Sequence, residues 1–370
     1  MLPEPSFPAR PADFVGRERE VEGFKAALRQ SVATLRMASF AVLGEWGIGK
    51  SSLLLKLADC CRGAHPPMLP VHLSISQDMG DYLRFAESLC DKLADALAAS
   101  DSLTTRLRTQ VRNWKFKRVN AGPLTVERDC QRFLTSGSAL LRHVLTDAWR
   151  QFVRPARFAG AVFFLDDLHN LALASGDAAL TIRDQFQAFG IEELNYSVCF
   201  SAKADYFSGT LSFAEPAVRF YNKLVLAPFT PEETFKYATA VFGSDPRKVQ
   251  ALSDWLYEKT VGHPYFLAFI SRELLAKGNH PPNQLWPEIF IRLEREKFQA
   301  DLAQLSEKDI ALLRALAAAG EHEFAPAPFA RNFQYEYFRR LTERGLLIRE
   351  GRGRYKLYHP LFRAFLQQAK

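Results

Sequence analysis

Residues 44–51 read Gly-Glu-Trp-Gly-Ile-Gly-Lys-Ser and match in full the G-x-x-x-x-G-K-[ST] pattern of a phosphate-binding loop. Glycines let such a loop curl so that its backbone N–H groups point inward at an anion. The lysine reaches the β- and γ-phosphates, and the last hydroxyl is a ligand for Mg²⁺. The sequence therefore predicts an ATP site whose contacts come from the loop and the next serine: Gly44, Glu45, Trp46, Gly47, Ile48, Gly49, Lys50, Ser51 and Ser52.

A second chemical element is a pair of carboxylates that follows six small or apolar residues at 160–165. Asp166 is predicted to hold Mg²⁺ through its waters. Asp167 is predicted to polarise the attacking water as a general base. The same two side chains could instead cap a helix whose first turn is residues 168–170.

A third candidate is Ser201, which ends an apolar run at residues 196–200. If that run is a strand between the loop's strand and the acidic strand, the Ser201 hydroxyl points at the γ-phosphate and senses hydrolysis. Lys203 is a weaker candidate for the same role. A serine at a strand end is also a routine turn former.

The elements that must position these residues follow from apolar runs and helical spacing. Strands are predicted at 39–43, 69–75, 160–166, 196–200 and 224–226, and helices at 51–61 and about 81–99. Buried apolar strands alternating with helices indicate an α/β fold with a parallel sheet. An insertion at about 100–158 contains a predicted β-hairpin near 114–126, whose aromatic and basic residues suit nucleic acid, a neighbouring subunit or a protected sheet edge.

After residue 230 the pattern becomes helical. Helices are predicted at 231–242, 246–260, 264–276 and 287–302, with Pro281-Pro282 as an exposed link. Residues 304–370 then predict a winged helix: a capped helix, a short helix at 327–332, a helix at 334–344, two wing strands around a glycine turn, and a last helix from 359 to 366. The predicted domains are therefore 1–229, 230–303 and 304–370.

Composition excludes several classes of protein. In 370 residues, 48% of them hydrophobic, no apolar run approaches the ~18–20 residues of a membrane span. The proline-rich start lacks the pattern of a signal peptide. The five cysteines have an odd count and no C-x-x-C spacing. These features favour a cytoplasmic protein with no membrane partner.

The net charge of +7 is concentrated at the C-terminal end. Residues 331–370 hold ten basic and three acidic side chains, so the rest of the chain is neutral. Such a patch predicts contact with duplex DNA or with an acidic protein. In a DNA complex, Arg339, Arg340 and Arg344 would enter the major groove, and Arg352 and Arg354 would bind phosphates.

Three segments together resemble a known family. The box at residues 14–18, the Asp166-Asp167 pair and residues 261–267 are similar to AAA+-related STAND ATPases and to origin-recognition and archaeal-type ATPases, over about residues 11–366. The resemblance implies a P-loop NTPase fold with a helical lid and a winged helix. It also assigns residues. Phe14, Val15 and Gly16 would enclose the adenine, and His263 and Pro264 would close over the nucleotide from the lid.

Two positions bear on the choice within this group. Origin-recognition ATPases have a sensing arginine three residues after the lid glycine, where this chain has Tyr265, so the STAND pattern fits better. Arg219 falls where AAA+ proteins place an arginine finger that reaches a neighbour's γ-phosphate, although STAND members often lack it. Residues 262–264 would also serve simply as a helix stop followed by a proline-started helix.

The combined interpretation is an ATP-binding and ATP-hydrolysing switch with Mg²⁺, slow in turnover, acting with a protein effector or as a nucleotide-dependent homo-oligomer. In the switch interpretation the winged helix packs on the nucleotide site. The alternative is a DNA-binding AAA+ loader or a regulator of transposition or DNA processing. A third is a scaffold that binds ATP and barely hydrolyses it.

Overall fold

The computed structural model describes residues 3–77, 79–100, 103–111, 137–171, 178–207, 215–243, 245–278, 280–320, 323–351 and 353–368. The chain forms two compact units. The sheet unit comprises Pro8–Glu45 and Gly49–Ala227, and the helical unit comprises the described residues of Met1–Phe7, Trp46–Ile48 and Pro228–Lys370. The predicted hairpin near 114–126 lies outside the described residues.

The sheet unit is built on five parallel strands in the order β2-β3-β4-β1-β5. The strand that carries Ser201 therefore lies between the strand before the loop and the strand that carries Asp166, which is the condition that the sensor role of Ser201 required. Its register pairs Val42 with Ser201. The bounds are β1 (Ser39–Leu43), β2 (Met68–Ser74), β3 (Gly160–Asp166), β4 (Tyr196–Ala202) and β5 (Tyr221–Val225).

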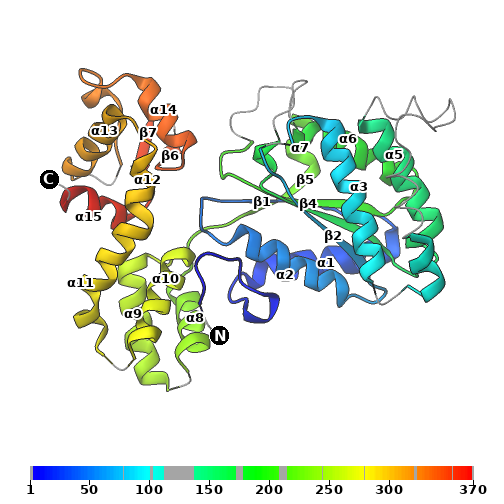
Figure 1. Ribbon diagram of the computed structural model, residues 1–370, viewed down its shortest axis with the longest axis horizontal. Coiled ribbons are helices and arrows are strands. Elements are labelled where there is room, and N and C mark those ends of the chain that lie inside the picture. The colour runs from blue at the N-terminus through cyan, green and yellow to red at the C-terminus, as the bar shows by residue number, and fades with distance from the viewer. Residues whose placement is uncertain are drawn as a thin grey trace. The chain divides into compact units, whose positions relative to one another are not determined.

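Alternate residues of the strands pack against two helix layers, as the strand pleat requires. On one face, the Phe24 ring of α1 contacts Phe40 of β1 and Phe164 of β3 at centroid distances of 5.2 and 6.2 Å. The other face, which includes Phe163, packs in one core with α3, α5 and α6. Figure 1 shows the strands between these helices. Their bounds are α1 (Glu18–Thr34), α2 (Lys50–Arg62), α3 (Tyr82–Ala99), α5 (Gly137–Ala148) and α6 (Ala178–Ile191).

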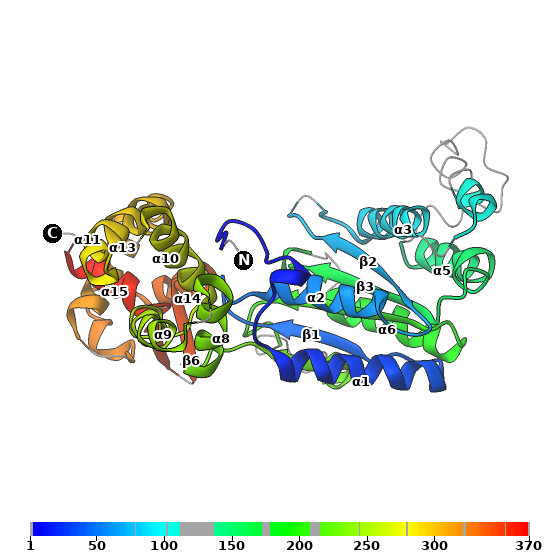
Figure 2. The same cartoon turned by 90° about the horizontal axis from the view of Figure 1, so that it is seen from below.

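The remaining elements of the sheet unit are short. A π-helical turn, η3 (Trp149–Val153), continues α5, and 3₁₀ turns form at η1 (Pro11–Asp13) and η4 (Leu168–Asn170). Helix α7 (Glu215–Phe220) precedes β5. Figure 2 gives a second view, in which β1 lies close to α1. None of the helices in the described part of the chain has the length and apolar character that a membrane span needs.

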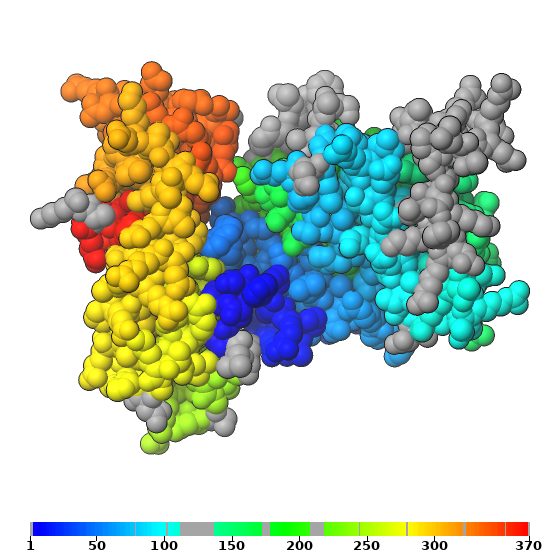
Figure 3. All heavy atoms as spheres, in the orientation of Figure 1, coloured from blue at the N-terminus to red at the C-terminus, as the bar shows by residue number. Residues whose placement is uncertain are grey.

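The helical unit contains α8 (Pro231–Phe242), α9 (Pro246–Thr260), α10 (Pro264–Lys277) and α11 (Pro282–Leu293). Helix α11 continues through a π-helical turn, η6 (Glu294–Phe298), into α12 (Gln299–Ala303), and Figure 3 shows this stretch in yellow to gold as one column. The prediction that a helix begins at Pro287 was wrong. Pro282 occupies the first turn, where a missing N–H has no partner to lose, and Pro287 lies inside the helix.

The C-terminal elements appear in the order that the sequence predicted for residues 304–370. They are α13 (Glu307–Ala318), α14 (Tyr335–Glu343), β6 (Leu347–Gly351), β7 (Arg354–Leu357) and α15 (Pro360–Gln368). The predicted short helix at 327–332 is a three-residue 3₁₀ turn, η7 (Ala327–Phe329). The name winged helix for this module stays a prediction.

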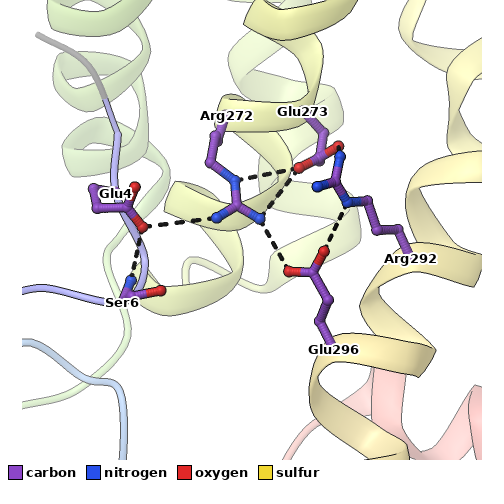
Figure 4. Close-up of polar contacts among 6 residues, drawn as sticks. All are labelled: Glu4, Ser6, Arg272, Glu273, Arg292 and Glu296. Carbon is purple, nitrogen blue, oxygen red and sulfur yellow. Dashed lines mark hydrogen bonds and ion pairs between the residues drawn. The ribbon is translucent and has the colours of Figure 1, made fainter.

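The N-terminal segment is bound to the helical unit by charge. Glu273 of α10 is 1% exposed and contacts Arg292 at 2.7 Å and Arg272 at 3.2 Å. Arg272 also contacts Glu296 at 3.2 Å and, at 3.7 Å, Glu4 of the N-terminal segment. Figure 4 shows these side chains converging from three parts of the chain. The buried carboxylate thus has two cationic partners.

Candidate functional site: a phosphate-binding loop and an acidic strand end

The loop at residues 44–51 connects β1 to α2, the position that phosphate binding requires. Gly47 and Gly49 have φ of +71° and +95°, values that L side chains rarely adopt. Helix α2 begins at Lys50 directly after Gly49. The loop therefore ends at a helix N-terminus, where unpaired N–H groups and the helix dipole favour an anion.

Lys50 is held by the loop itself. Its Nζ donates to the carbonyl oxygens of Gly44 and Glu45 at 3.0 and 2.8 Å. Burial lowers the pKa of Lys50, and the nearby carboxylates, Asp167 first among them, act in the opposite direction. The ammonium is thus kept between the loop and the acidic strand end.

The acidic strand end and Ser201 form one hydrogen-bonded unit. Ser201, which is fully buried, donates its hydroxyl proton to Asp166 Oδ1 at 2.5 Å and accepts the Asp167 N–H at 2.8 Å. The strand order predicted this neighbourhood but not these bonds. Ser201 therefore orients the Asp166 carboxylate and holds the backbone of Asp167 in this structure.

Asp167 departs from the strand with φ of 58° and ψ of 49°, in the left-handed region. Burial and then the charge of Asp166 raise the pKa of its carboxyl group. His169 Nδ1 lies 4.0 Å from Asp167 Oδ1, and burial lowers the pKa of His169 to about 4, so the ring is neutral near pH 7. Sequence reasoning missed His169, and its only signal was a histidine two residues beyond an acid pair.

The donor set fits Mg²⁺. Magnesium in phosphoryl-transfer sites takes one or two carboxylates and fills the rest of its octahedron with water and substrate oxygens. Asp166, 9% exposed at the strand end, and the Ser51 hydroxyl supply hard oxygen donors of that kind. The described residues contain no group of three His, Cys, Asp or Glu side chains that could hold a metal. A magnesium site of this type does not need one.

Comparison with known proteins agrees with this geometry. Residues 13–187 match the family model of the AAA ATPase domain. No curated protein matches the sequence.

Solved structures show the same fold at low identity. A Walker-type ATPase of Pyrococcus abyssi is 15% identical, with a TM-score of 0.60, over 97% of this chain and 98% of its own. The ORC2 protein of Aeropyrum pernix, solved in ADPNP and ADP complexes, is 13% identical, with a TM-score of 0.59, over 98% of this chain and 96% of its own. These likenesses confirm the predicted P-loop NTPase fold.

A tetratricopeptide-sensor STAND protein of Pyrococcus horikoshii is 18% identical, over 98% of this chain and 44% of its own, with a TM-score of 0.39. The family match over residues 13–187 supports the predicted kinship with AAA+ ATPases, whereas kinship with the origin-recognition group stays a prediction. The preference for the STAND group stays a prediction.

The box at residues 14–18, ahead of the phosphate loop, has a constrained backbone. Gly16 and Arg17 both have positive φ, 77° and 61°. Arg17 is 6% exposed and its guanidinium donates to the Ala227 carbonyl at 2.5 Å. Phe14 and Val15 are half-buried beside this turn. Their predicted contact with adenine stays a prediction, and the buried bond of Arg17 is a further anchor that the sequence did not reveal.

Ser52 has a different environment from the rest of the predicted nucleotide contacts. Its hydroxyl accepts the Ala9 N–H at 3.0 Å. Lys56, one turn further along α2, donates to the Pro11 carbonyl at 3.0 Å. The chain before the box is therefore fixed to the first two turns of α2.

His263, Pro264 and the tip of the loop lie together in the helical unit. His263 is the N-cap residue of α10 and Pro264 its first residue. His263 Nε2 lies 3.2 Å from the Trp46 carbonyl oxygen, and the Tyr265 N–H donates to the Gly47 carbonyl at 3.2 Å. The structure thus brings the predicted lid residues to the outer turn of the loop.

Arg219 is exposed at the end of α7, immediately before β5. Lys203 follows the end of β4. Their predicted roles as finger and sensor stay predictions.

Several basic side chains of the C-terminal module form ion pairs with acids of the same module. Arg340 donates to Asp309 Oδ1 at 2.5 Å, and Asp309 is 2% exposed. Burial alone would raise the pKa of Asp309, but hydrogen bonds from Arg340 and Ser306 outweigh it and lower the pKa. Further ion pairs join Arg339 with Glu336 and Glu343, Arg354 with Glu323, and Lys356 with Glu350. Arg352 lies outside the described residues.

Proposed function

We propose that the protein is a Mg²⁺-dependent ATPase whose nucleotide state switches the arrangement of its helical and C-terminal modules. The observation that supports this proposal best is the hydrogen-bonded set of Ser201, Asp166 and Asp167. Ser201 lies near the end of β4, which pairs with the strand before the loop, and the two aspartates lie at the end of the neighbouring strand, β3. A glycine turn that only starts a helix would not need an acidic strand end and a bonded serine on the neighbouring strands. A site for phosphoryl transfer needs a base and a carboxylate for its metal.

The proposed roles follow from these donors and acceptors. The N–H groups of the loop and the Lys50 ammonium bind the β- and γ-phosphates, and Ser51 and Asp166 hold Mg²⁺, which when bound would neutralise phosphate charge. Ser201 fixes the orientation of the Asp166 carboxylate and the backbone of Asp167. Asp167 takes a proton from the attacking water, and its raised pKa makes it a stronger base than an exposed aspartate.

The other assigned residues complete this proposal. Phe14, Val15 and Gly16 contact the base, and His263 and Pro264 respond to the nucleotide. Arg219 acts on a neighbouring subunit. The domains are 1–229, 230–303 and a winged helix at 304–370, in a cytoplasmic protein.

The ion pairs of the C-terminal module favour a protein effector or a second copy over duplex DNA. Arg340 neutralises a buried carboxylate, and removing it to bind a DNA phosphate would leave Asp309 buried without its cationic partner. Arg339 forms ion pairs with Glu336, one turn earlier in α14, and with Glu343, one turn later. Arg339 and Arg340 are two of the three arginines, with Arg344, that a DNA-reading helix would place in the major groove.

The first test is nucleotide binding and hydrolysis by purified protein. We expect Mg²⁺-dependent ATP binding that Lys50→Ala abolishes. Asp167→Asn should bind ATP and lose roughly 10²–10⁴-fold in kcat, the usual contribution of a general base. Arg339→Ala is the matched control, since it changes charge far along the chain. ATP binding that survives in Lys50→Ala would contradict the proposal.

A second test distinguishes the switch from a DNA machine. Mass measured in solution with ADP and with a non-hydrolysable ATP analogue should differ if nucleotide controls assembly. Affinity for duplex DNA should be undetectable or only weakly salt-dependent. A steep loss of DNA affinity with rising salt would instead favour the DNA-binding alternative, because phosphate contacts release counterions.

A further inference from the structure

The outer turn of the phosphate loop is held by an aromatic and cationic cluster within the helical unit. The Trp46 ring lies 4.5 Å from the Tyr265 ring, at an interplanar angle of 58°. Lys297 Nζ lies 3.9 Å from the centroid of the Trp46 ring. We call this set of Trp46, Tyr265 and Lys297, with His263, the loop clasp.

Lys297 is well fixed for this contact. It belongs to the π-helical turn η6, and such turns change the direction of side chains within a helix. Its side chain is 15% exposed, and its Nζ contacts Asp301 Oδ1 at 2.5 Å. Asp301 Oδ2 in turn accepts the Tyr358 hydroxyl at 3.0 Å, just before α15. The cation is therefore partly desolvated, which strengthens its attraction to an indole face.

The clasp also binds the main chain of the loop. His263 Nε2 contacts the carbonyl of Trp46, and the Tyr265 N–H donates to the carbonyl of Gly47. A Cβ atom at Gly47 would lie 2.9 Å from Tyr265 Cβ and 3.0 Å from His263 Cε1. Glycine at position 47 therefore serves this close approach as well as the positive φ.

These two bonds orient the N–H groups that phosphate needs. In a planar trans peptide the C=O and the following N–H point in opposite directions. With the Trp46 and Gly47 carbonyls directed at the start of α10, the N–H groups of Gly47 and Ile48 point away from α10. In a curled phosphate loop, N–H groups on the side opposite the outward carbonyls line the anion site.

We propose that the loop clasp pre-organises the phosphate loop, so that Tyr265, Lys297 and Trp46 are positioning residues for nucleotide binding. The inference rests on the proposed function and deepens it, because it makes nucleotide affinity depend on the packing of the helical unit. The cation on Lys297 links this packing to Tyr358 and thus to the C-terminal module. Neither the loop pattern, which leaves position 46 open, nor the domain match assigns such a role.

The test uses the full-length protein and two readouts. Hydrogen exchange in nucleotide-free protein reports the Tyr265 amide, which is bonded to Gly47 in the clasp. Titration with a fluorescent ATP analogue and Mg²⁺ reports Kd. We expect Lys297→Met and Trp46→Ala to accelerate exchange at Tyr265 and to raise Kd roughly 2- to 30-fold, the range of a cation–π contact.

Two further variants sharpen the test. Trp46→Phe keeps an aromatic ring and should recover most of the affinity. Lys259→Met removes a matched lysine, whose Nζ lies 5.6 Å from the Trp286 ring in the same unit, and should leave Kd and the Tyr265 exchange unchanged. Trp46 is 49% exposed, so its replacement leaves folding intact.

The outcomes separate the two proposals. No MgATP binding by the wild-type protein overturns the proposed function. If the wild type binds but Lys297→Met and Trp46→Ala bind equally or more tightly, the clasp does not pre-organise the loop and this inference alone is overturned. Unchanged exchange at Tyr265 in both variants overturns it as well.

Discussion

His359 shows how burial of one side chain ties stability to pH. The ring is 3% exposed, its Nε2 contacts the Thr260 carbonyl at 2.8 Å, and burial lowers its pKa to about 4. An unfolded histidine has a pKa near 6.5, so between about pH 6.5 and about pH 4 the unfolded state binds more protons. Stability is therefore complete above this window and falls as the pH drops through it.

This burial predicts a measurable loss of stability. From about pH 7.5 to about pH 5 the His359 contribution falls by about 2 kcal/mol. We expect urea unfolding of His359→Gln to show a pH dependence smaller by that amount. An identical pH dependence in wild type and variant would show that folding does not lower the pKa of His359.

Glu273 and its arginines make a second prediction for single residues. Arg292→Met leaves the buried Glu273 carboxylate with fewer donors, and loss of a hydrogen bond to a charged group costs about 1.5–3 kcal/mol. Chemical unfolding should show this decrease. The control is Arg339→Met, whose ion pairs are exposed and which should leave the unfolding midpoint unchanged. Equal midpoints for both variants would contradict the assigned burial.

At the scale of elements, replacing a glycine by alanine should raise stability in α1 and lower it just before α10. Gly23 lies in α1, and a Cβ atom added there would meet only open space, so Gly23→Ala should stabilise by about 0.5–1 kcal/mol through helix propensity. At Gly262, with φ +71°, a Cβ would lie 1.9 Å from the Phe229 carbonyl oxygen. Calorimetry should therefore show a lower thermal midpoint for Gly262→Ala and a higher one for Gly23→Ala. A lower midpoint for Gly23→Ala would contradict the expected gain in helix propensity.

Elements with a strong local pattern were predictable from the sequence. The apolar run at β3 and the leucines of α2 predicted the bounds of these two elements to within a residue or two. The position of Ser201 beside Asp166 was only a condition until the strand order was known. The start of α11 was not predictable, because Pro282 and Pro287 are both suited to the first turn of a helix. The helix begins at Pro282, and Pro287 lies inside it. The bounds of a helix or strand can therefore be predicted from the sequence when a single start or stop signal is present.

Contacts between distant residues were beyond sequence reasoning. Arg340 meets Asp309 across 31 positions, in an ion pair that the sequence did not predict. Trp46 and Tyr265 meet across an even longer separation, at a position that the loop pattern leaves open. Charge and motif predict which residues belong to a site, whereas the tertiary fold determines which residues each of them contacts.

At the scale of the whole molecule, the chain passes between its two units several times, and two of these passages fall within the phosphate loop. Gly44, Lys50 and Ser51 belong to the sheet unit, whereas Trp46–Ile48 belong to the helical unit. A ligand that binds the complete loop should therefore stabilise both units. Ligand at about 100 times Kd stabilises by about 2.7 kcal/mol.

Tryptophans allow the two units to be followed separately. Trp149 lies in the sheet unit and Trp286 in the helical unit. In single-tryptophan proteins with the other indoles replaced by phenylalanine, MgATP should raise the urea midpoint reported by either probe. Lys50→Ala should abolish both shifts, whereas Lys297→Met should reduce the shift at Trp286 more than the shift at Trp149. A shift confined to Trp149 in the parent protein would mean that nucleotide binding is felt by the sheet unit alone, and the molecule would then lack the coupling that a switch requires.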